Sequence, residues 1–130
     1  MKRGFQPRCR KCIGLDGTFL KGICKGQLLA AVGKDGNNQM FPIAWAVVGT
    51  ESKDTWRWFM MILREDLNLG AGSQLVIISD MQKGLISASE EIFPECEHRM
   101  CARHILANWS QSWRGMERRK RFWGCARATF

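Results

Sequence analysis

Two stretches of sequence decide the fold. Residues 12–21 read Cys-Ile-Gly-Leu-Asp-Gly-Thr-Phe-Leu-Lys, and residues 75–80 read Leu-Val-Ile-Ile-Ser-Asp. Both are typical of buried strands, and each carries an aspartate at or near its end, Asp16 and Asp80. Two carboxylates on neighbouring strands can share divalent cations, as in enzymes that cut and join phosphodiester bonds. The pair therefore predicts a central sheet and a candidate metal site.

The rest of the chain supplies the other elements of an α/β domain. Apolar alternation predicts strands and spacings of three and four predict helices. The expected strands are 12–20, 27–32, 40–48, 74–79 and 98–100, and the expected helices are 53–68, 83–93, 102–113 and 116–130. The order β-β-β-α-β-α-β-α predicts an antiparallel meander followed by alternating units in a mixed sheet. A right-handed crossover allows the first strand to pair in parallel with 74–79, which would bring the aspartates together.

Length and charge limit the class of protein. The 130 residues form one domain or part of one, with no apolar run long enough to span a bilayer and no secretory signal. The net charge of +8 is concentrated at the ends: residues 1–12 hold five basic and no acidic residues, and residues 96–130 hold eight basic and two acidic ones. We interpret residues 1–11 as a basic lead-in. Basic ends on a mildly acidic body favour a nucleic acid partner.

Each aspartate also has a simpler interpretation. Asp16 could hydrogen-bond its own turn, helped by Gly17, and Asp80 could be the N-cap of the next helix. Together, on strands expected to be adjacent, the metal pair is the stronger hypothesis, because two close carboxylates stay ionised only with a cation between them. The expected ion is Mg²⁺, which takes oxygen ligands and keeps several waters.

A cluster of cysteine and histidine residues precedes the helix at 102–113. Cys96, His98, Cys101 and His104 lie within nine residues and offer four ligands to zinc. Their spacing matches no known four-ligand finger, so we favour a buried thiol with a histidine that packs or binds phosphate. The Cys-x-x-Cys at 9–12 lacks a second pair and remains unassigned. Zinc is therefore a minor alternative to Mg²⁺ or Mn²⁺.

The last predicted helix is basic and aromatic. Arg118, Arg119, Lys120 and Arg121 form a cluster among tryptophans. Cations contact nucleic acid phosphates and aromatic rings stack on bases, so this cluster is the candidate nucleic-acid-binding site. An amphipathic helix with buried tryptophans and a solvated basic face is the alternative. The cluster also resembles a short nuclear-import signal.

Several separated motifs, all in the right order, resemble the plant Mutator-like element (MULE) transposase domain and the far-red-response transcription factors derived from such transposases. The resemblance covers residues 5–130. It rests on Gly14-Leu-Asp16-Gly17, Gly26 to Gly33, Asp35 to Gln39, Pro42 to Val48, Ile78 to Leu85 and Phe93 to His104.

The resemblance implies a ribonuclease-H-like fold with a DDE catalytic triad that uses Mg²⁺ or Mn²⁺. It makes Asp16 and Asp80 the first two catalytic aspartates, and Cys101 and His104 the family's Cys-x-x-His motif. The third acid of the family, a glutamate, lies well downstream, beyond a helical insertion. Glu117 comes too early to take that role.

The domain at 12–130 is therefore expected to be the first, C-terminally incomplete part of a transposase core. Such a chain would bind DNA, could assemble with other transposase chains, would reside in the nucleus and would not associate with a membrane. We expect it to be inactive by itself, because the third acidic residue is absent. The alternative is a domesticated module that binds DNA or another protein without catalysis.

Overall fold

The computed structural model describes residues 9–23 and 25–128, and its centre is a five-stranded mixed sheet. The strands lie in the order β3-β2-β1-β4-β5. Their bounds are Cys9–Phe19 for β1, Gln27–Asp35 for β2, Met40–Val48 for β3, Val76–Ser79 for β4 and Glu97–Met100 for β5. The first three are antiparallel neighbours, and β4 and β5 run parallel to β1. This topology confirms the predicted ribonuclease-H-like mixed sheet.

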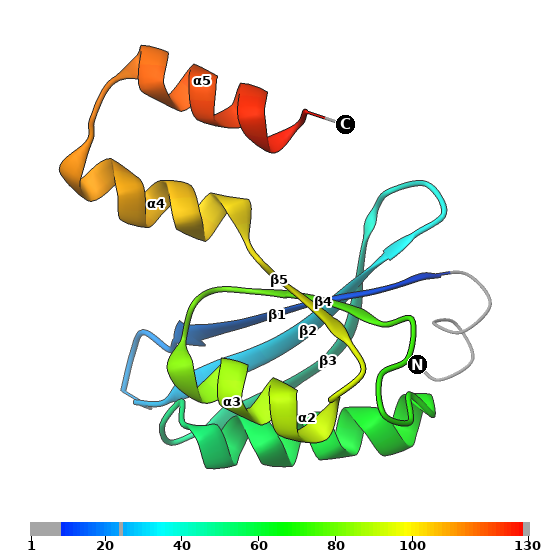
Figure 1. Cartoon of the computed structure of the whole chain (residues 1–130). Coiled ribbons are helices and arrows are strands. Elements are labelled where there is room, and N and C mark those ends of the chain that lie inside the picture. Colours follow the sequence, from blue (N-terminus) through cyan, green and yellow to red (C-terminus); the bar gives the residue numbers. More distant parts are fainter. Residues whose placement is uncertain (1–8, 24, 129–130) are drawn as a thin grey trace.

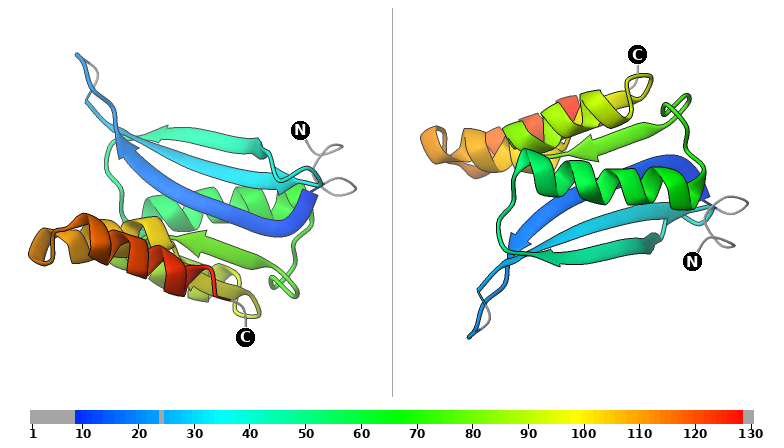
Figure 2. Two further views of the ribbon diagram at one scale, coloured as in Figure 1. Left: turned by 90° about the horizontal axis from the view of Figure 1, so that it is seen from above. Right: turned by 90° about the horizontal axis from the view of Figure 1, so that it is seen from below.

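The described residues form four helices, two between the later strands and two after the last strand. α2 (Lys53–Leu67) and α3 (Lys83–Ile92) cover one face of the sheet, which we call the packed face (Figure 1). α4 (Ala102–Ser112) and α5 (Met116–Ala126) form a hairpin on the opposite side. Seen from above, this hairpin leaves β1, β2 and β3 uncovered on their second face, the open face (Figure 2). None of the described helices is long and apolar enough to cross a membrane.

Strand alternation builds the core. Ile13, Leu15, Leu29, Ala31 and Ile77 are all nearly inaccessible to solvent and occupy alternate positions on β1, β2 and β4. Alternate residues of a strand point to opposite faces, so these five define the packed face. The buried stripe of α2 meets them and consists of Trp56, Phe59, Met60, Leu63 and Leu67. The apolar spacings of three and four that predicted the helix at 53–68 therefore belong to core residues.

Local signals fix the ends of several elements. Ser52 is the N-cap of α2, where its side chain accepts from the Thr55 amide in a capping box. The β2–β3 turn closes on Asp35, whose carboxylate accepts from the amides of Asn37 and Gln39. Pro42 lies on an edge strand and beside a bulge at Ile43, and both positions tolerate its missing N–H. β1 begins at Cys9, earlier than the expected strand at 12–20.

Candidate metal site and its supporting residues

The parallel pairing of β1 with β4 aligns the strand segments that lead to the two aspartates. Its last registered pair is Gly14 with Ile78, and pairing continued two residues further would set Asp16 opposite Asp80. Ile13, Leu15, Ile77 and Ser79 face the core, so the alternation of β1 turns Asp16 toward the open face, while Asp80 directly follows the end of β4. Neighbouring strands lie about 4.8 Å apart. Asp16 is therefore exposed on β1, and Asp80 is half-buried directly after the neighbouring strand β4.

Asp16 lies within β1 and is exposed, near the first turn of α4. Its Oδ1 atom is 4.0 Å from Nε2 of His104, an ion pair whenever the imidazole is protonated. The Cys101 amide donates to the Ser79 carbonyl at 2.6 Å and ties the start of α4 to the end of β4. His104 follows one turn later, so the Cys-x-x-His motif brings an imidazole over the carboxylate. Its buried Nδ1 has no hydrogen-bond partner within the described part of the chain.

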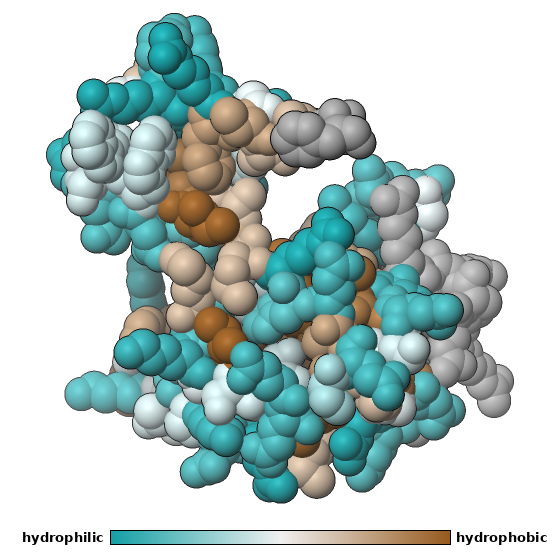
Figure 3. All heavy atoms as spheres, viewed as in Figure 1, coloured by the Kyte–Doolittle hydropathy of each residue, from teal (hydrophilic) through white to brown (hydrophobic). Residues whose placement is uncertain are grey.

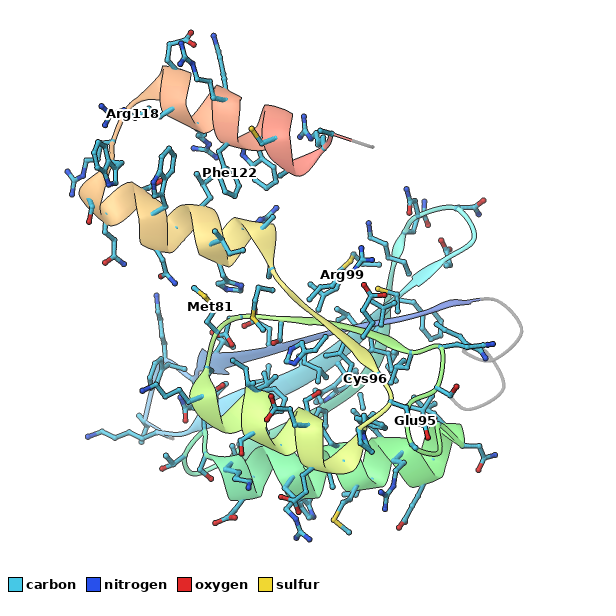
Figure 4. All side chains as sticks on the ribbon, viewed as in Figure 1. Met81, Glu95, Cys96, Arg99, Arg118 and Phe122 are labelled. Carbon is cyan, nitrogen blue, oxygen red and sulfur yellow. The ribbon has the colours of Figure 1, made fainter. Side chains whose placement is uncertain are left out.

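Asp80 follows β4 and is held by its own turn. Its Oδ1 accepts from the Gln82 amide at 3.0 Å. The N-cap of α3 is Gln82, whose side chain accepts from the Leu85 amide, so the simpler interpretation of Asp80 as the N-cap is wrong. Met81, the next residue, lies between the sheet and α4 (Figure 4).

A buried hydroxyl and an imidazole lie behind Asp80. Ser79 is 1% exposed, and its Oγ donates to the Asp80 carbonyl at 2.8 Å. The same Oγ is 2.8 Å from Nε2 of His98 on β5. Because the only hydroxyl proton goes to Asp80, Nε2 of His98 must be the donor in that second bond. Burial lowers the pKa of His98 against a weaker opposing effect of Glu90, so the ring is neutral near pH 7.

Glu51 explains why the residue directly after Asp16 is a glycine, Gly17. A Cβ atom on Gly17 would lie 2.7 Å from the carboxylate carbon and both oxygens of Glu51. That carboxylate accepts from Nε1 of the fully buried Trp56 at 2.9 Å, and the Glu51 amide donates to the side chain of Gln27. The backbone beside Asp16 is therefore packed directly on Glu51. Sequence reasoning missed Glu51; its only signal was a glycine inside a strand.

The cysteine and histidine cluster does not converge on one point. Cys96 contacts Ser89, with Sγ and Oγ 3.8 Å apart, while His98 contacts Ser79 and His104 approaches Asp16. Burial raises the pKa of the Cys96 thiol. Over residues 9–23 and 25–128, no three His, Cys, Asp or Glu side chains are grouped closely enough to hold a metal ion. The four-ligand zinc alternative therefore has no support in this geometry.

The donor chemistry of the aspartate pair fits a hard cation. Asp16 and Asp80 offer carboxylate oxygens, which Mg²⁺ and Mn²⁺ prefer, and both face solvent that could complete the coordination. The side chain of His104, which is partly exposed, approaches the Asp16 carboxylate to 4.0 Å. These residues would hold a cation through two protein ligands and water.

The basic cluster lies on the second helix of the hairpin. Arg118, Arg119, Lys120 and Arg121 are all exposed, and no residue of α5 is buried. The Arg118 guanidinium lies over the Trp113 ring at 4.9 Å. Phe122 points back toward α4 and stacks on Trp109, with ring centroids 6.1 Å apart (Figure 4). The inner side of the hairpin is apolar and its outer side is polar (Figure 3).

The strand order and the mixed pairing of the sheet define the class, a ribonuclease-H-like α/β domain. The MULE transposase domain family matches residues 12–108, most of the chain. This protein belongs to the MULE transposase domain family.

Curated relatives include bacterial and plant proteins. The chain is 30% identical over 88 residues to the transposase for insertion sequence element ISRM5 of Rhizobium meliloti (strain 1021), covering 67% of this chain and 21% of that protein. It is 33% identical over 75 residues to the IS256 transposase in transposon Tn4001 of Staphylococcus aureus, covering 58% and 18%. With FAR-RED IMPAIRED RESPONSE 1 of Arabidopsis thaliana it shares 30% identity over 95 residues, covering 72% and 11%. The chain thus spans about a fifth or less of these relatives.

A solved structure of the Mos1 transposase catalytic domain, determined with raltegravir and Mn, is also similar. Its TM-score is 0.49 at 12% identity, covering 92% of this chain and 72% of that one.

Proposed function

We propose that this chain forms part of the catalytic core of a Mutator-like DNA transposase, with Asp16 and Asp80 as the first two metal-binding carboxylates. One observation supports the proposal: within a MULE domain, β1 and β4 are parallel neighbours whose register, continued by two residues, would set Asp16 opposite Asp80. The Gln82 amide and the nearby His104 restrict where these carboxylates can point. Divalent cations held there would polarise a phosphodiester and activate a water or a 3′-hydroxyl for strand cleavage and transfer.

The hairpin supports DNA as the substrate. The hairpin lies on the side of the sheet opposite α2 and α3 (Figure 1), the side on which we propose that the aspartates act, and its residues 118–121 are exposed. Phosphate contacts of this kind hold a duplex in place without reading its sequence. We propose that these cations anchor the DNA backbone while the aspartates act on a nearby phosphodiester, and that the protein works in the nucleus, where its DNA substrate lies.

The 130-residue chain offers two carboxylates at this site, and no third acidic side chain joins them among the described residues. Loss of one ligand from a two-metal site impairs cation positioning and transition-state stabilisation together. We therefore expect this chain by itself to bind Mn²⁺ weakly and to leave DNA uncut. Cleavage should return when a glutamate is supplied by further sequence or by another transposase chain.

The test is Mn²⁺ binding by calorimetry. The two carboxylates are changed one at a time in Asp16→Asn and Asp80→Asn. Asp54→Asn is the matched control, because Asp54 is an exposed carboxylate in the first turn of α2 on the packed side. We expect binding to vanish in both site variants and to persist in the control. Binding that survives either site variant, or no binding by the folded wild type, would contradict the proposal.

A non-catalytic DNA-binding module is the second candidate, and the unburied basic helix α5 favours it. Its test is DNA binding in a chelating buffer. Affinity that is equal with and without Mn²⁺ and unaffected by Asp16→Asn would support a module that does not use the carboxylates. Affinity that depends on both would support the transposase proposal.

A further inference from the structure

We propose that Ser79 and His98 are positioning residues that set the orientation of Asp80 through the buried side of the sheet. The inference rests on the proposed metal-binding role of Asp80. Neither side chain reaches the open face where the carboxylate is presented. They act on the backbone that carries it.

The first step concerns the direction in which Asp80 points. β4 ends at Ser79, so Asp80 lies outside the regular strand. A residue in this position has no partner strand to fix its peptide planes. The Ser79 hydroxyl supplies that restraint by donating to the Asp80 carbonyl at 2.8 Å. With the carbonyl fixed, the side chain of Asp80 can accept from the Gln82 amide in a single geometry.

The second step concerns what holds the hydroxyl. A serine hydroxyl rotates freely unless its lone pairs are engaged. His98 lies on β5, and its Nε2 approaches the same oxygen to 2.8 Å. Donation from Nε2 leaves the hydroxyl proton only one use, which is the bond to Asp80. The imidazole on β5 thus selects the rotamer of Ser79 and, through it, the turn that presents the carboxylate.

The third step concerns the surroundings of this relay. Ser79 is 1% exposed, and its carbonyl also accepts from the Cys101 amide at 2.6 Å. The hydroxyl and the carbonyl of Ser79 are therefore both engaged where little water reaches, and an unmet hydrogen bond is costly there. The strand end is tied on one side to β5 and on the other to the start of α4. Second-sphere hydrogen bonds of this kind orient metal ligands and typically change metal affinity about 10- to 100-fold.

Four variants isolate the relay. Ser79→Ala removes the hydroxyl, His98→Met removes the donor, and His98→Gln keeps a donor near the position of Nε2. Ser89→Ala is the matched control, because Ser89 is an equally buried serine whose hydroxyl contacts Cys96 instead of Asp80. Unfolding in urea identifies any variant that fails to fold.

The first readout needs no metal. Hydrogen exchange of the Gln82 amide, followed by NMR, reports whether Asp80 still accepts that proton. We expect exchange about three- to tenfold faster in Ser79→Ala and His98→Met, matching the loss of one hydrogen bond. Ser89→Ala should match wild type, and His98→Gln should recover most of the protection. An unchanged Gln82 amide in Ser79→Ala would overturn the proposal, whether or not the chain binds a cation.

The second readout is the dissociation constant for Mn²⁺. We expect Mn²⁺ to bind about 10- to 100-fold more weakly to Ser79→Ala and to His98→Met than to wild type. The variant that combines the two changes should show no further loss, because both changes act through one hydroxyl. Additive losses would mean that the two residues act separately and would overturn the relay. Absence of Mn²⁺ binding in wild type would remove the proposed metal site, and the exchange experiment would then decide whether Asp80 is still oriented by Ser79 and His98.

Discussion

Replacing Gly17 by alanine should destabilise the fold by displacing Glu51. The added Cβ would lie 2.7 Å from the Glu51 carboxylate, well inside van der Waals contact. The carboxylate ends a flexible side chain and can rotate away, but it then loses its 2.9 Å bond from Nε1 of Trp56. Trp56 is fully buried, so its N–H would be left without an acceptor.

The size of the effect follows from two opposing contributions. An unsatisfied buried donor costs about 1–3 kcal/mol. Glycine loses more conformational entropy than alanine when a strand forms, so alanine by itself should stabilise this position by about 0.5–1 kcal/mol. The free energy of unfolding should therefore fall by roughly 1–2 kcal/mol, a decrease in Tm of about 3–8 °C for a chain of this length. Urea unfolding followed by tryptophan fluorescence measures it.

A double-mutant cycle separates this cause from general strain. In a Glu51→Ala background the carboxylate is already absent, so Gly17→Ala should be neutral or stabilising. Gly49→Ala serves as the control, because nothing lies within 4 Å of the Cβ it would add. An equal loss in both backgrounds would refute the reasoning, and so would a Gly17→Ala variant as stable as wild type.

Three further predictions concern other parts of the molecule. Burial lowers the pKa of His98 below its ordinary 6.5, with Glu90 opposing, so the unfolded chain binds the proton first as the pH falls. The stability contributed by neutral His98 is complete above about pH 6.5 and is lost as the pH falls through the lower folded pKa. Unfolding free energies at pH 7.5 and 5 should differ more in wild type than in His98→Gln, and equal differences would contradict the assignment. Changing Arg118, Arg119, Lys120 and Arg121 together to glutamine should weaken binding of any DNA sequence. The slope of log K against log salt concentration should become shallower, by up to about 0.9 for each phosphate contact that is lost. Changing four exposed residues of α2 is the control, and an unchanged slope would exclude α5 as a phosphate contact. Leu29 is 0% exposed, so Leu29→Ala should lower the free energy of unfolding in urea by about 2–5 kcal/mol. Leu28→Ala, on the open face, should lower it much less. Equal losses would mean that the two faces of β2 are misassigned.

Much of the fold follows from local patterns. Alternation predicted the strands, and spacings of three and four predicted a helix at 53–68, within one residue of the observed α2. The parallel pairing of β1 with β4 could also be predicted, because right-handed crossovers leave few topologies for this order of elements. Boundaries differ by a few residues, as at β1, where pairing with β2 extends the strand back to Cys9.

The supporting residues around the aspartates were not predictable in the same way. Glu51 reaches Gly17 and Trp56 from a loop outside the sequence motifs. His98 meets Ser79 because β5 pairs with β4 in one particular register, and a shift of one residue would have turned the imidazole to the other face. Sequence spacing offered these histidines and cysteines as zinc ligands. Their separate partners appear only when the strands are placed.

The sequence by itself determined the order of elements, the mixed sheet, the family and the two aspartates, because periodicity and short motifs are encoded locally along the chain. Only the tertiary structure decided that Ser79 contacts His98, that His104 reaches Asp16 and that the basic helix α5 has no buried residue. These features depend on strand register and helix packing, which are set by contacts between residues far apart in the chain.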